Sequence, residues 1–163
     1  MIVVLDASTL INLVNGEVLA AALSLPGHDF QVSGVVRQES KTVAAALEAA
    51  VDSGALAWVD DSMISANQFS EAKADWQLDD GETECILAGH ALGCVVASDD
   101  LAARKVVISK LGGGRLLGSI GLLRLAILEE LLEPEEAFAA YKLMVARGGF
   151  LPEFDRADFN PPF

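Results

Sequence analysis

The sequence predicts an α/β fold in which helices flank a mostly parallel sheet. Two observations support it: strand-like runs alternate with helical runs along the chain, and two short apolar runs end in aspartate, at Asp6 and Asp99. Such strands deliver their last side chain to the rim of a parallel sheet, where open α/β folds place their ligands. With 163 residues, of which 52% are hydrophobic, residues 1–163 fit one domain with a sizeable core.

The individual elements follow from local patterns. Short runs rich in apolar and β-branched residues predict strands at 2–5, about 30–33, 55–59, 94–97 and 115–117. Helices are predicted at about 8–14, 16–24, 35–53, 66–76, 79–92, 100–111, 119–131 and 134–147. Acidic residues at Asp79–Glu82 complement the dipole at the start of one helix, and Glu133-Pro134 starts the last. Residues 148–163, rich in proline and phenylalanine, are expected to pack over the core as an irregular tail.

The net charge and the hydropathy pattern narrow the classes of function that the chain can have. The formal net charge of −13 argues against a nucleic-acid binder, because phosphate binding normally leaves a basic footprint. A metal-dependent nuclease escapes this objection if divalent ions neutralise an acidic site. The apolar stretches are shorter than the ~20 residues of a membrane span, and no signal-peptide pattern follows Met1. We therefore expect a cytoplasmic protein without membrane association, in which Cys85 and Cys94 are buried and reduced.

Five acidic residues lie at predicted strand ends or in the helices that follow them: Asp6, Glu39, Glu82, Glu84 and Asp99. Mg²⁺ and Mn²⁺ prefer hard oxygen ligands, and one or two carboxylates with water and a substrate phosphate suffice. Crowded carboxylates repel one another, so a cation would stabilise the cluster and could activate water for phosphodiester hydrolysis.

Each of these residues also has a simpler interpretation. Asp6 and Asp99 suit helix N-caps, Glu39 suits a solvated helix face, and the other two suit a helix N-terminus. Asp100 is expected to cap the helix that follows it. Residues two apart on a helix point to different sides, so the sequence leaves open whether Glu82 or Glu84 is the third acid.

The order of these segments resembles the PIN-domain family of metal-dependent ribonucleases over about residues 2 to 120. The four matching motifs are Asp6 with Ser8, Val35–Glu39, Asp80–Ala88 and Val95–Arg104. One branch of the family has a similar Gly-Glu-x-Glu helix start and a similar Asp-Asp pair with a downstream arginine. The chain departs from the family in having Glu where a third Asp is more usual.

The resemblance implies a three-layer α/β/α sandwich and a carboxylate pocket that holds Mg²⁺ or Mn²⁺ and cleaves single-stranded RNA. The implied metal ligands are Asp6, Glu39, Glu82, Glu84 and Asp99, and the catalytic set is Asp6, Glu39, Glu84 and Asp99. Many members of the family are toxins that pair with a small antitoxin protein, so a toxin role with an antitoxin partner is also expected. His28 and His90 lie outside the motifs and are expected to be bystanders.

Other classes fit less well. A haloacid-dehalogenase site needs a second Asp two residues after the first, where this chain has Ser8, and a receiver domain has its paired acids near the first strand. Gly112–Gly118 does not lie between a first strand and its helix, so it is not a dinucleotide loop. A non-catalytic PIN-like protein-interaction module remains as the alternative. The apolar helix 119–131 also predicts a C₂ homodimer, unless the tail covers it.

Overall fold

The computed structural model describes the backbone of residues 1–163 and every side chain except that of Asp61. Five parallel strands form one sheet in the described chain, in the order β3-β2-β1-β4-β5. The strands are β1 (Ile2–Leu5), β2 (Asp29–Val32), β3 (Ala57–Trp58), β4 (Val95–Ala97) and β5 (Leu116–Leu117). The predicted parallel sheet is confirmed, and all of its strand pairs are parallel.

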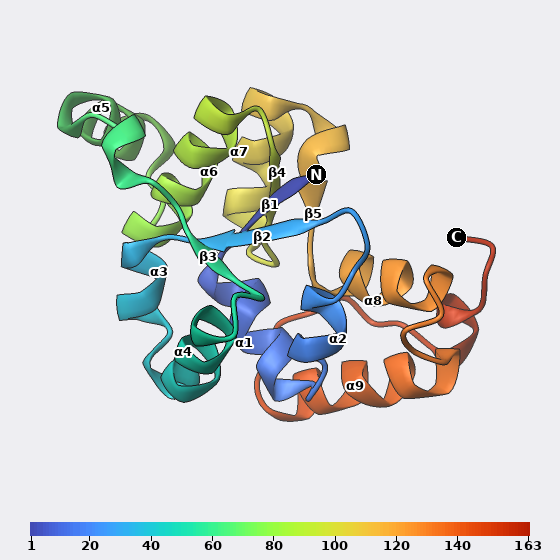
Figure 1. Ribbon diagram of the computed structural model, residues 1–163. Coiled ribbons are helices and arrows are strands. Elements are labelled where there is room, and N and C mark those ends of the chain that lie inside the picture. The colour runs from blue at the N-terminus through green and yellow to red at the C-terminus, as the bar shows by residue number, and fades with distance from the viewer.

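Helices cover both faces of this sheet. They are α1 (Ala7–Asn15), α2 (Leu19–Leu23), α3 (Gly34–Glu39), α4 (Ala44–Asp52), α5 (Ala66–Trp76), α6 (Asp80–Leu92), α7 (Leu101–Leu111), α8 (Ser119–Leu128) and α9 (Pro134–Ala146). Short 3₁₀ turns add η1 (Lys41–Val43), η2 (Asp61–Met63), η3 (Gly113–Arg115) and η4 (Arg156–Phe159). Figure 1 shows α5, α6 and α7 on one side of the sheet and α1, α2, α4, α8 and α9 on the other. The three-layer sandwich is therefore confirmed.

Strand register brings the two aspartate-bearing strand ends together. Leu5 at the end of β1 pairs with Ala97 at the end of β4. The next amide, Asp6 N–H, donates to the Ala97 carbonyl at 2.9 Å. Asp6 therefore leaves the sheet beside Ser98 and Asp99, at the edge where parallel α/β folds bind ligands.

One predicted helix is wrong. The continuous helix at 35–53 is interrupted at Ser40, where φ −88° and ψ 34° depart from helical geometry, and η1 separates α3 from α4. Ser40, Thr42 and Val43 are weak helix formers, because hydroxyl side chains compete for backbone groups and β-branched side chains lose rotamer freedom. The break leaves Glu39 at the end of α3 rather than in the middle of a helix.

The predicted strand at 55–59 is also too long. Only Ala57 and Trp58 pair with β2, in register with Gln31 and Val32. The amides of Ala55 and Leu56 instead donate to the Ala50 carbonyl and close the last turn of α4. Ala55 and Leu56 therefore belong to the end of α4 and not to the sheet.

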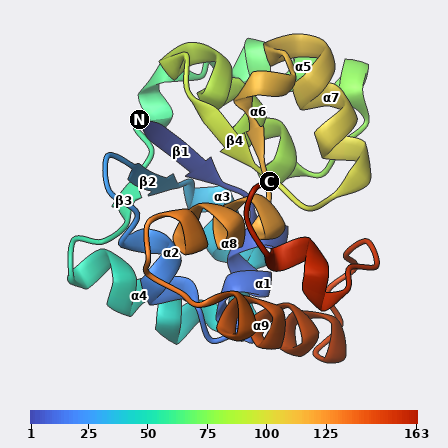
Figure 2. The same cartoon turned by 90° about the vertical axis from the view of Figure 1, so that its right-hand side faces the viewer.

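The C-terminal segment packs against α9. Phe159 in η4 is fully buried, and its ring lies among those of Phe138, Tyr141 and Phe154. The Tyr141 hydroxyl donates to the Pro152 carbonyl at 2.9 Å and accepts the Phe154 amide at 3.1 Å. Figure 2 shows this segment, in red, beside α8 and α9.

Helix α8 uses most of its apolar surface inside the chain. Leu122, Leu123, Ala126 and Ile127 are all buried, and Leu128 is exposed. The excess apolar surface that motivated the homodimer is therefore mostly covered, and the dimer stays a prediction. No helix in the described chain is both long and apolar enough to cross a membrane. Cys85 and Cys94 are free and buried, as predicted.

Candidate active site

Asp6 is a buried carboxylate with one unsatisfied oxygen. Its side chain is 2% exposed, and Oδ2 accepts hydrogen bonds from Ser8 Oγ at 2.7 Å and Ser98 Oγ at 2.9 Å. Oδ1 is buried and has no hydrogen-bond partner in the described chain. Asp6 occupies the N-cap position of α1, but its side chain makes no capping bond. Burial raises the pKa of Asp6, and the hydroxyl groups of Ser8 and Ser98, followed by the amides of Ala7 and Ser8, offset part of this rise.

Asp99, at the end of β4, has both oxygens engaged. Oδ1 accepts the Ser119 amide at 2.9 Å, and Oδ2 accepts Asn12 Nδ2 at 2.8 Å as well as the Ser119 hydroxyl. Asp99 thereby caps the start of α8 and ties it to α1. Its carboxylate is half-buried and still lines two surface hollows, so its predicted role as a metal ligand stays a prediction.

Glu39 reaches the N-terminus of α6 from the end of α3. Its Oε1 accepts the Gly81 amide at 3.0 Å. A methyl group at Gly81 would lie 2.0 Å from Glu39 Oε2, so any side chain there would displace this carboxylate. Burial raises the pKa of Glu39, and the carboxylates of Asp6, Asp79 and Asp80 raise it further.

Glu82 lies in the same electrostatic environment. Its Oε2 accepts the Asp79 amide at 3.1 Å and completes a capping box at the start of α6. Burial, and then the nearby charges of Asp100 and Asp6, raise the pKa of Glu82 to about 7. The structure therefore brings both Glu39 and Glu82 within reach of the charge of Asp6.

Glu84 points elsewhere. Its side chain is 9% exposed, and Oε2 accepts the Val35 amide in the first turn of α3 at 3.4 Å. Glu82 and Glu84 thus diverge, as helical geometry requires of residues two apart. Glu82, in contrast, lies close enough to Asp6 for that charge to contribute to its raised pKa.

Three residues outside the predicted set shape this corner. Ser98 binds Asp6, and Asn12 binds Asp99 while being 4% exposed. Asp100 caps α7 as predicted, since its Oδ1 accepts the amides of Ala102 and Ala103, and it also raises the pKa of Glu82. The sequence indicated the role of Asp100, whereas the contacts of Ser98 and Asn12 join distant parts of the chain and had no local signal.

The donor set fits a divalent cation. As they stand, no three His, Cys, Asp or Glu side chains among the described residues are arranged to hold a metal ion. The charge of the buried Asp6 carboxylate, however, reaches Glu39 and Glu82, whose pKa values are raised first by burial and then by neighbouring carboxylates that include Asp6. Hard oxygen donors carrying uncompensated charge are the ligands that Mg²⁺ and Mn²⁺ prefer. Asp6, Glu39 and Glu82 are the residues that would hold such an ion.

Comparison with known protein families shows which family the chain belongs to. The family model DUF3368, described as a PIN domain, matches residues 2–154. The chain belongs to the PIN-domain family. PIN domains are generally nucleases that act on RNA, and they usually use divalent metal ions. No curated protein and no solved structure is significantly similar to the chain. The predicted resemblance is confirmed and extends beyond residue 120, into the segment that follows α9.

Proposed function

We propose that this PIN domain is a Mg²⁺- or Mn²⁺-dependent endoribonuclease that hydrolyses phosphodiester bonds of single-stranded RNA. The observation that carries the proposal is the buried Asp6 carboxylate, which has one unsatisfied oxygen. It lies beside Glu39 and Glu82, whose pKa values are raised in part by its charge. Such a cluster is costly without a counter-charge, and a divalent ion supplies one.

The side chains have separate tasks in this proposal. Ser8 and Ser98 hold Asp6 through one oxygen and leave the other free for a ligand. The Gly81 amide orients Glu39, and the Asp79 amide orients Glu82. When bound, the divalent ion supplies the Lewis acidity that activates water and stabilises charge on the phosphodiester oxygens. No Ser, Cys or His nucleophile is required.

The third acid of the proposed site is either Glu82 or Glu84, and the surroundings of the two side chains distinguish them. We assign it to Glu82, because its pKa responds to Asp6, and keep Glu84 and Asp99 as the other predicted ligands. E82Q should lower cleavage by about 10²-fold, the order of losing one electrostatic stabiliser. E84Q is the matched comparison on the same helix and should lower cleavage less than E82Q, so an equal or larger loss in E84Q would reverse the assignment.

RNA cleavage tests the proposal directly. Wild type and D6N would be incubated with a generic single-stranded RNA pool and Mn²⁺ or Mg²⁺, with and without chelator. Cleavage is expected only in wild type without chelator. Equal cleavage in all four samples would mean contamination, and no cleavage in any of them would contradict the proposed activity.

The proposed biological role is that of a cytoplasmic toxin with a small antitoxin partner, which family membership supports. Expression of wild type should then arrest growth of a bacterial host, and D6N should not. A co-expressed partner that relieves the arrest must also bind the purified chain. Arrest by D6N equal to that by wild type would contradict a toxin role based on catalysis.

A non-catalytic interaction module is the alternative, favoured by the net charge of −13. Thermal unfolding separates the two. A ligand that binds only the folded state at 100 times its dissociation constant adds about 2.7 kcal/mol of stability. The nuclease should gain such stability with Mn²⁺ and lose the gain in D6N, whereas the interaction module should not respond.

A further inference from the structure

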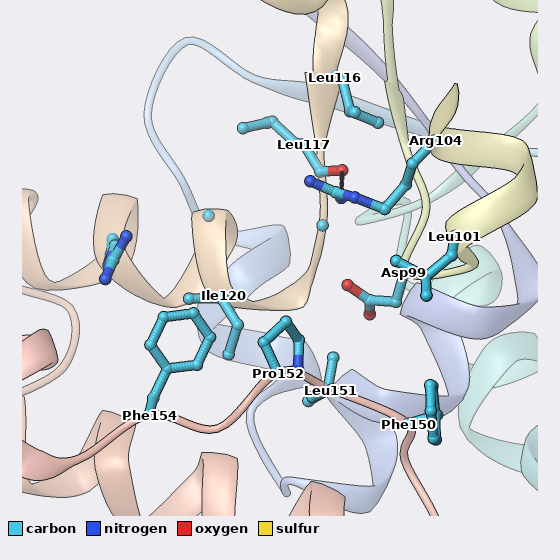
Figure 3. A pocket seen from close by; sticks show the side chains of 13 residues that line it. Asp99, Leu101, Arg104, Leu116, Leu117, Ile120, Phe150, Leu151, Pro152 and Phe154 are labelled. Atoms are coloured by element: carbon cyan, nitrogen blue, oxygen red, sulfur yellow. Dashed lines mark hydrogen bonds between the residues drawn. The ribbon is translucent and has the colours of Figure 1, made fainter. Parts of the chain in front are cut away.

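A cavity of about 450 Å³ opens beside Asp99, between the start of α7, α8 and the C-terminal segment. Figure 3 shows Asp99, Leu101 and Arg104 along one side of it and Ile120, Pro152 and Phe154 along the other. Its volume lies within the ~300–1,000 Å³ of small-molecule sites. The carboxylate cluster does not account for this mostly apolar cavity.

Two cations line the cavity in an otherwise acidic protein. Arg104 donates through Nη1 to the carbonyls of Ser98 and Leu117, at 2.7 and 2.9 Å. Arg124 donates to the Asp158 carbonyl at 3.0 Å and lies over the rings of Phe154 and Phe163. Neither guanidinium takes part in an ion pair in the described part of the chain. Asp99 is the one carboxylate among the described residues that line the cavity, so two positive charges face one negative charge there, in a chain whose net charge is −13.

Phe150 stands at the mouth of this cavity. It is 84% exposed, the largest value among the exposed large hydrophobic side chains described. It also lines a second hollow of about 300 Å³, together with Ser8, Asn12 and Asp100. The exposed ring therefore lies where the cavity and the acidic corner meet.

The backbone before Phe150 is fixed against the candidate active site. The Gly149 amide donates to the Met144 carbonyl at 2.8 Å. A Cβ at Gly149 would lie 2.5 Å from Asn12 Oδ1 and 2.8 Å from the Met144 carbonyl, so only glycine fits. Asn12 in turn binds Asp99. The ring is thus presented to solvent from an anchored position, beside carboxylates that the proposed function uses.

We propose that this cavity is a subsite for one unpaired nucleobase of single-stranded RNA, which stacks on Phe150 while Arg104 and Arg124 attract the adjoining phosphate. Single-stranded RNA is recognised by stacking of splayed bases on aromatic rings, combined with cationic contacts to the backbone. A nucleotide offers a flat aromatic face to the apolar lining and an anionic phosphate to the guanidinium groups. A base held in a duplex cannot enter the cavity. The inference rests on the proposed function for its substrate class.

Binding in EDTA tests the subsite apart from catalysis. Fluorescence anisotropy would measure the affinity for a labelled hexaribonucleotide of mixed sequence and for the same backbone with abasic riboses. F150A and F150L should each weaken binding of the hexamer roughly 5- to 100-fold, the range for one base–aromatic stack, and F150W should restore it. The abasic backbone should bind wild type as weakly as the hexamer binds F150A. I108A, at another exposed apolar residue, is the control.

Other outcomes overturn the inference. Equal affinities of wild type and F150A for the hexamer, or full affinity in F150L, would exclude stacking at this position. Light scattering that shows a wild-type dimer and an F150A monomer would assign the cavity to a second copy of the chain. A purified antitoxin that binds wild type but not F150A, with RNA affinity unaffected, would assign it to a protein segment.

Cleavage assays separate this inference from the proposed function. F150A should lower cleavage of the hexamer more than hydrolysis of bis(p-nitrophenyl) phosphate, which carries no base. An equal loss on both substrates would contradict the subsite while leaving the nuclease proposal standing. Loss of hexamer binding in F150A without any cleavage by wild type would support the subsite and contradict the nuclease.

Discussion

The ends of β1 and β4 place two aspartates side by side with opposite surroundings. Asp6 is almost wholly buried and keeps Oδ1 without a partner, while two hydroxyl groups bind its Oδ2. Asp99 is half-buried, and a backbone amide, an amide side chain and a hydroxyl group satisfy both of its oxygens. The two carboxylates differ in the number of hydrogen-bond donors around them. A carboxylate oxygen that is already desolvated and has no donor can bind a cation with little further desolvation cost.

This contrast indicates that the two strand-end aspartates, Asp6 and Asp99, have different roles. A strand-end aspartate can serve the ligand or the fold, depending on what its neighbours donate. In this chain Asp6 is placed for a ligand, and Asp99 joins α1 to α8. The following variants test whether the division is real.

The largest expected effect is that of D6N on activity. Loss of the free carboxylate should lower RNA cleavage by about 10³-fold, the upper range for one electrostatic contact to a transition state. The melting temperature should not fall. Burial raises the pKa of Asp6 above its unfolded value, so its stabilising contribution is present at low pH and lost as pH rises. Removal of this charge at neutral pH therefore relieves the folded state. A large loss of stability in D6N would show that Asp6, like Asp99, stabilises the fold.

D99N should have the opposite profile. The amide group introduced by the substitution would face the donors Ser119 and Asn12, so charge-assisted bonds are lost and one amide group opposes another donor. We expect a loss of about 2–3 kcal/mol in urea unfolding, the range for hydrogen bonds to a charged group. D100N changes the adjacent carboxylate, which caps α7, and should alter stability little, because asparagine caps a helix about as well as aspartate. A stable, inactive D99N would indicate that Asp99 acts mainly as a metal ligand and not in the fold.

E82Q should show a smaller, pH-dependent effect on stability. The pKa of Glu82 is raised from 4.5 to about 7. Its stabilising contribution is therefore complete below pH 4.5 and is lost as pH rises through about 7. Without metal, E82Q should be more stable than wild type at pH 8, by about 1 kcal/mol after solvent screening is allowed for, and the gain should shrink towards pH 4. Identical pH profiles of the two proteins, followed by thermal melting, would show that the carboxylates are not coupled.

The smallest effect is expected from S8A. The Ser8 hydroxyl donates to Asp6 Oδ2 and accepts the Asp99 amide, so it joins the two strand ends. Its loss should cost about 1 kcal/mol, as for a partly buried hydrogen bond. Cleavage should fall only a few-fold, since Ser98 still holds Asp6. S98A is the matched comparison. A loss of cleavage in S8A as large as in D6N would mean that orientation, and not charge, limits the site.

Much of this arrangement could be predicted from the sequence. The alternation of strands and helices indicated the parallel sheet, and the apolar runs before Asp6 and Ser98 correctly located β1 and β4. The break at Ser40 was missed: the weak helix formers around it are a local signal, but propensity by itself does not fix where a helix ends. That break leaves Glu39 within reach of Gly81.

The fold class, the order of the acidic motifs and the edge of the sheet where they gather are all properties of the sequence. They follow from hydrophobic periodicity and from the rule that parallel strands share one carboxyl edge. Which carboxylates stay uncompensated depends instead on tertiary contacts. Donors to Asp99 come from Asn12 and Ser119, and those to Asp6 from Ser8 and Ser98. A carboxylate's charge state depends on burial and on such distant partners, and neither is encoded in the residues next to it.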